Sequence, residues 1–112
     1  MLKKIIANFL PPVVLYVRDF SRVPGGRCVG DGPYSGQRYR SEVLLPTLNE
    51  YRRVVVIFDD LAGVASSWLN EVFAHPDVRV HRDRISFRST GYSEIYDRIC
   101  KNFLKGLRPY KG

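Results

Sequence analysis

Two adjacent serines, Ser66 and Ser67, open a predicted helix and are the hydroxyl groups best placed for chemistry in this chain. One interpretation is capping, since a serine hydroxyl at a helix start accepts a hydrogen bond from a free backbone amide. The other is a phosphorylated switch, because a phosphate there adds about two negative charges where free amides can receive them. The residues alone leave both interpretations open.

A glycine-rich segment at 25–36 offers backbone amides that could bind an anion. Arg27, Arg38 and Arg40 could close on that anion. Asp31, Ser35 and Gly36 would contact the ligand or a partner. The segment matches neither the dinucleotide-binding fingerprint nor the P-loop. A structural turn with glycines at positive φ is the alternative interpretation. Ser35 is also the predicted N-cap of the next helix.

Three acidic side chains lie in the predicted second helix or directly after the predicted central strand: Glu71, Asp59 and Asp60. Glu71 falls on the face of the second helix away from Leu69 and Val72, which predicts a carboxylate in contact with solvent or a partner. Asp59 and Asp60 follow an apolar strand, at the edge where open α/β sheets bind ligands. Adjacent strand residues point to opposite faces, so we interpret this pair as solvated charge and not as an acid–base pair.

Positive charge is concentrated in the C-terminal third. The chain has a net charge of +7, and residues 77–112 contribute +5 of it with nine basic and four acidic side chains. Arg82, Arg84 and Arg88 would form a basic stripe on one side of a strand. Such a stripe either contacts nucleic-acid phosphates or an acidic partner, or protects a sheet edge as solvated charge.

The sequence does not favour an enzyme, a metal or a cofactor. The histidines and cysteines, His75, His81, Cys28 and Cys100, form neither a nucleophile arrangement nor a metal-ligand motif. The cysteines are predicted to be reduced thiols of a cytoplasmic protein. No apolar run approaches the roughly 20 residues that span a bilayer, so no membrane contact is expected.

The expected architecture is a single α/β domain over residues 1–112. Residues 1–12 are predicted as an N-terminal arm or edge strand. Strands are expected at 13–20, at 27–29, at the fully apolar 54–58 and within 78–88. Helices are expected at 36–50, bent near Pro46, at 66–74, and at 93–105 with Gly106 as C-cap. These elements predict a mixed four- to five-stranded sheet with about three helices packed on it.

Short motifs in the first two-thirds of the chain follow a recognisable order. They are Asp19-Phe20-Ser21, Pro24-Gly25-Gly26-Arg27, Asp31-Gly32-Pro33-Tyr34-Ser35-Gly36, Tyr39-Arg40, Leu45-Pro46-Thr47-Leu48 and Ser66-Ser67-Trp68-Leu69 with Glu71 and Phe73. On these motifs, residues 13–74 resemble the bacterial STAS-like domain family of unknown function. The resemblance fades over the basic part at 75–112.

The resemblance extends to STAS domains of anti-sigma-factor antagonists, in which a phosphorylated serine switches partner binding. It would place Ser66 at the phospho-acceptor, beside Ser67, with Ala65 in place of the aspartate that precedes it there. It therefore implies a non-catalytic regulatory module that binds a protein partner, such as a GHKL-type ATPase or kinase. The alternative is a nucleic-acid-associated or mobile-element-encoded protein that binds a host complex through its basic third. The oligomeric state stays open, and a homo-oligomer is compatible with the sequence.

Overall fold

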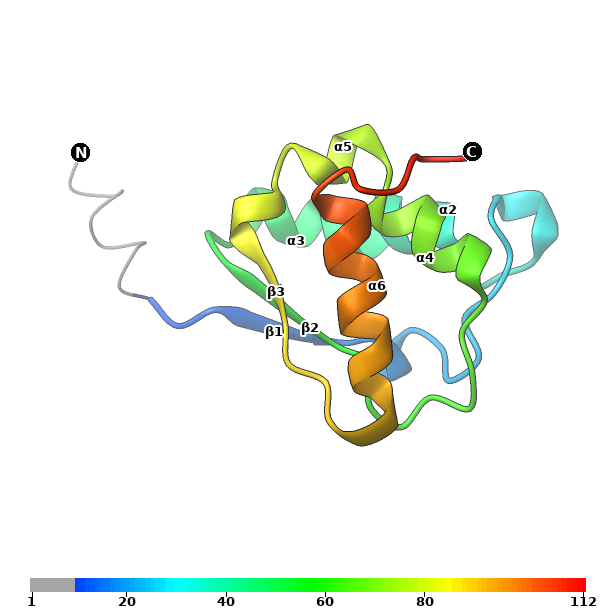
Figure 1. The fold of residues 1–112 in the computed structure, drawn as a ribbon, viewed down its shortest axis with the longest axis horizontal. Helices are drawn as coiled ribbons and strands as arrows, with labels where there is room; N and C mark the ends of the chain where they lie inside the picture. The colour runs from blue at the N-terminus through cyan, green and yellow to red at the C-terminus, as the bar shows by residue number, and fades with distance from the viewer. Residues whose placement is uncertain (1–9) are drawn as a thin grey trace.

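The computed structural model describes residues 10–112, and the arm expected at 1–12 lies largely outside them. Within these residues a three-stranded parallel sheet has the order β1-β2-β3 (Figure 1). Its strands are β1 (Val13–Tyr16), β2 (Val54–Ile57) and β3 (Ile85–Phe87). The expectation of a four- to five-stranded mixed sheet is therefore wrong.

Two expected strand regions account for the difference. The segment at 27–29 leads into a 3-10 turn, η2 (Val29–Asp31), and does not pair with β1. In the region 78–88, only its end is a strand, because α5 (Pro76–Arg79) and the 3-10 turn η4 (Arg82–Arg84) precede β3. Pro76 ends the preceding helix as expected, but it also begins α5, since proline is favoured in the first helical turn.

The helix predicted at 36–50 is present as three consecutive segments: α2 (Gly36–Tyr39), the π-helical turn η3 (Arg40–Leu44) and α3 (Leu45–Glu50). Ser35 is its N-cap, as predicted, and its Oγ accepts the Arg38 amide at 3.2 Å. The change from π to α geometry at Leu45 places Pro46 in the first turn of α3, the part of a helix that tolerates proline best.

The apolar run at 54–58 forms the central strand, as predicted. Val54, Val55 and Val56 are at most 2% exposed, and β2 lies between the two other strands. The remaining long helices are α4 (Ser66–Phe73) and α6 (Glu94–Leu104). Both agree with the predicted helices to within one or two residues. None of the helices in residues 10–112 has the length and apolar character that a membrane span requires.

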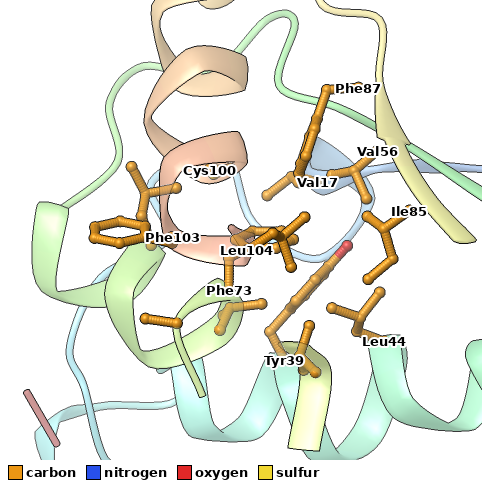
Figure 2. Close-up of a cluster of buried hydrophobic side chains, with 14 of the residues drawn as sticks. Val17, Tyr39, Leu44, Val56, Phe73, Ile85, Phe87, Cys100, Phe103 and Leu104 are labelled. Atoms are coloured by element: carbon orange, nitrogen blue, oxygen red, sulfur yellow. The ribbon is translucent and has the colours of Figure 1, made fainter. Parts of the chain in front are cut away.

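One hydrophobic core joins the sheet to the helices. Figure 2 shows strand side chains such as Val56 and Ile85 meeting helix side chains such as Tyr39 and Phe73. Ile95 and Leu107, which follow the four-residue apolar spacing of the last helix in the sequence, are 56% and 70% exposed. The buried face of α6 instead consists of Cys100, Phe103 and Leu104, with Asp97. Gly106 adopts a φ of 77° after the helix, which fits its predicted role as C-cap.

Candidate functional site

Glu71 on α4 is the centre of a buried ion-pair cluster. The residue is 3% exposed, and its Oε1 accepts Arg27 Nη1 at 3.0 Å. Arg40 Nη1 donates to Oε2, and the Tyr110 hydroxyl donates to both carboxylate oxygens at 3.0 and 2.9 Å. We call Glu71, Arg27, Arg40 and Tyr110 the Glu71 cluster. The prediction of a solvent-facing carboxylate is wrong, because α2 and the C-terminal tail (residues 105–112) cover that face of α4.

Gly36 brings α2 close enough for this cluster to form. A Cβ at this position would lie 2.9 Å from both Glu71 Cβ and the Trp68 carbonyl oxygen. Only the absence of a side chain allows that approach, since van der Waals contact requires more room. Arg40 lies four residues later, so it is on the same face of the helix and reaches Glu71.

The cluster keeps Glu71 ionised. Burial by itself would raise the pKa of this carboxyl. Hydrogen bonds from Arg40, Tyr110 and Arg27 outweigh burial and hold the pKa below its ordinary value of 4.5. Two guanidinium groups face one carboxylate, so the cluster retains a net positive charge.

The glycine-rich segment folds largely on itself. Asp31 Oδ2 accepts the amides of Arg27 and Cys28 at 3.2 and 2.9 Å. The Gly36 amide donates to the Gly26 carbonyl at 2.9 Å, and Gly26 has a φ of 85°. Of the three arginines predicted to close on an external anion, Arg27 and Arg40 close on Glu71, an anion of the chain itself. Arg38 instead pairs with Glu42.

The C-terminal tail is bound to α4 through Asn70, which is 4% exposed. Asn70 Nδ2 donates to the Pro109 carbonyl at 2.9 Å. Asn70 Oδ1 accepts the Lys111 amide at 2.9 Å and Arg27 Nη1 at 3.1 Å. In Figure 1 this tail runs from the end of α6 over towards α4.

A cavity of about 600 Å³ lies between the tail and the start of α4. We call it the basic cavity, because three of its lining residues are cationic and none is acidic. The lining residues are Arg27, Ser66, Ser67, Asn70, Phe103, Arg108, Pro109 and Lys111.

Both predicted serines lie at this cavity. Ser66 is exposed and Ser67 is partly exposed. The N-cap of α4 is Ala65, which has no side-chain acceptor for the first-turn amides. The serines therefore do not cap the helix in the predicted way, and the start of α4 is open to a negatively charged group.

Arg108 and Lys111 were not predicted as site residues. Among residues 10–112, neither has an ion-pair partner. The concentration of positive charge at 77–112 pointed to this part of the chain, but it could not indicate which of its nine cations face the serines.

The predicted basic stripe does not form. Arg84 Nη1 donates to the carbonyls of Leu48, Tyr51 and Arg52 at 2.9 to 3.2 Å, so this side chain closes the end of α3. Arg82 and Arg88 are exposed, but they lie on a 3-10 turn and beyond the end of β3. The three side chains thus do not share one strand face.

Asp59 and Asp60, which follow the central strand and were interpreted as solvated charge, bond to different partners. Asp59 accepts the amide and hydroxyl of Thr90 at 2.7 and 3.0 Å. Asp60 has a φ of 62° and pairs with Arg18. Among residues 10–112, no group of three or more histidine, cysteine or acidic side chains could hold a metal ion.

Comparisons with protein-family models, curated proteins and solved structures find no match. The resemblance of residues 13–74 to the STAS-like family therefore rests on the motifs in the sequence.

Proposed function

We propose that this chain is a non-catalytic regulatory module that binds a protein partner through the surface around Ser66. The observation that carries the proposal is an exposed serine at the open start of α4, beside a cavity lined by three cations. An acidic group of a partner would be attracted to this surface and would find hydrogen-bond donors there. The motifs at 13–74 favour an ATPase or kinase of the GHKL type as partner.

Phosphorylation of Ser66 would switch this surface. A phosphoserine carries about two negative charges at pH 7, and it would lie among Arg27, Arg108 and Lys111. This phosphate, attached to the chain itself, would then neutralise the positive charge that attracts the partner. Because like charges repel, a partner that presents an acidic group would be released.

Co-purification with a GHKL-type ATPase tests this proposal. Tagged wild-type chain should recover the ATPase, as should Ser66→Ala. Ser66→Asp should reduce recovery by about tenfold or more, the equivalent of roughly 1.4 kcal/mol. Ser41→Asp is the matched control, because Ser41 is exposed and does not line the cavity. Failure to recover an ATPase, or equal recovery by both aspartate variants, would refute the proposal.

Nucleic-acid binding is the competing function. It is favoured by the charge of +5 over residues 77–112, but Arg84 is engaged by backbone carbonyls and adds little to a phosphate-binding surface. Binding to a generic duplex that weakens steeply with salt, and that Arg82→Gln and Arg88→Gln impair, would support this alternative.

A further inference from the structure

We infer that the basic cavity is a binding site for a phosphate monoester supplied by another molecule. The inference concerns a ligand bound in trans by the unmodified chain, because a phosphate on Ser66 would occupy the same cations. The site combines charge from two distant parts of the chain. Arg27 comes from the glycine-rich segment, whereas Arg108 and Lys111 come from the C-terminal tail.

The charge of the cavity fits a dianion. Arg27 shares its guanidinium with Glu71, but Arg108 and Lys111 have no acidic partner within residues 10–112. Two uncompensated cations match the charge of about −1.5 to −2 on a phosphate monoester better than the single charge of a carboxylate or phosphodiester. The hydroxyls of Ser66 and Ser67 add donors for the phosphate oxygens.

Buried contacts hold the Arg27 side chain and the backbone of the tail that carries the other two cations. Asn70 Oδ1 accepts Arg27 Nη1 and the Lys111 amide, so one side chain fixes both sides of the cavity. Glu71 Oε1 accepts Arg27 Nη1 at 3.0 Å, and it also accepts the Tyr110 hydroxyl and so holds the tail. Arg27 therefore loses little freedom when an anion binds, and the backbone of the tail that carries Lys111 is already positioned.

The cavity has room for the organic part of an ester beside its phosphate. About 600 Å³ is the volume of a typical small-molecule site and exceeds what a phosphate alone would fill. Phe103 and Pro109 supply an apolar wall beside the cations. The organic part of a phosphorylated side chain or of a phosphorylated small molecule would contact this wall.

Amide NMR titrations of the full chain test the inference. O-phosphoserine, a phosphoserine peptide and inorganic phosphate would be titrated in turn, at constant ionic strength. We expect saturable shifts at Ser66, Ser67 and Lys111 with both esters, and weaker binding of inorganic phosphate. The phosphoserine peptide and the free amino acid distinguish a protein-borne ligand from a small one.

The control is a double variant with the same loss of charge. Arg108→Gln with Lys111→Gln should weaken ester binding about tenfold or more, whereas Lys101→Gln with Lys105→Gln should not, since these exposed residues of α6 and its C-cap do not line the cavity. The amide spectra report directly whether each variant is folded. Equal weakening by the two double variants, equal binding of inorganic phosphate, or tighter binding of a DNA oligonucleotide would overturn the inference.

Discussion

Replacing Glu71 with glutamine should destabilise this fold more than any surface change. The substitution keeps the shape of the side chain but removes the charge that Arg27 and Arg40 share. Arg40 is 9% exposed, so its guanidinium would stay buried beside a second one. Breaking a buried ion pair in this way costs about 3–5 kcal/mol. Glutamine can still accept one hydrogen bond, and we therefore expect the free energy of unfolding to fall by about 3 kcal/mol. This loss is a large part of the roughly 5–15 kcal/mol that stabilises such a domain.

Urea unfolding measures this cost directly. The midpoint for Glu71→Gln should fall by roughly 1–2 M with an unchanged m value. Glu42→Gln is the matched control, because Glu42 pairs with Arg38 at 2.7 Å on an exposed helix surface and should cost less than about 0.5 kcal/mol. Combining Glu71→Gln with Arg40→Met should restore part of the stability, because the unpaired charge is removed with its partner. A loss below about 1 kcal/mol for Glu71→Gln would refute this account of the cluster.

Three further predictions follow from the same contacts. The pKa of Glu71 in the folded chain lies below 4.5, so its carboxylate stabilises the fold above that pH and stops doing so as the pH falls through the folded pKa. Urea midpoints measured against pH should show this loss of stability in the wild type and lack it in Glu71→Gln. Gly36→Ala should lower the free energy of unfolding by about 1–3 kcal/mol through overpacking against α4, whereas Gly63→Ala, with nothing within 4 Å of the added carbon, should change it by less than about 0.5 kcal/mol. A thiol reagent should label the exposed Cys28 rapidly and Cys100 only after denaturation, because burial raises the pKa of the Cys100 thiol; equal native rates would contradict the packing of α6.

The central strand and the long helices could be predicted because each has an unambiguous local pattern. Four consecutive valine and isoleucine residues over 54–57 leave no polar face, so the strand has to lie in the middle of the sheet. Ser35 and the apolar spacing that follows it mark the helix at 36–50. Pro46 alone could not show whether that helix would break or change its hydrogen-bonding geometry.

The region 78–88 could not be assigned because its local signals conflict. Alternating apolar residues such as Val78 and Val80 suggested a strand, yet these residues fall in and after a short helix. His75 is the N-cap of this helix and its Nδ1 accepts the Asp77 amide at 3.1 Å, although histidine is not a typical N-cap residue. With that helix in place, only three residues remain for β3, and the sheet is smaller than expected.

For a similar reason, only part of the candidate site could be predicted from the sequence. Ser66 and Arg27 carry recognisable local signals, a helix start and a glycine-rich turn. Tyr110 and Lys111 follow the last helix in a segment without periodicity, and the tail is positioned by the side chain of Asn70 and by Glu71. Contacts of this kind depend on the tertiary structure, and no local sequence pattern predicts them.

The buried carboxylate also decides how binding experiments on this protein must be interpreted. Glu71 fixes Arg27 at the wall of the basic cavity and, through Tyr110, holds the tail that carries Arg108 and Lys111. We therefore expect a variant of Glu71 to lose the proposed ligand or partner binding even though the carboxylate does not line the cavity. Variants of Arg108 and Lys111 change the cavity without touching the buried cluster, because both side chains are exposed. These tail variants separate recognition from folding, since they remove charge while the contacts of the Glu71 cluster remain.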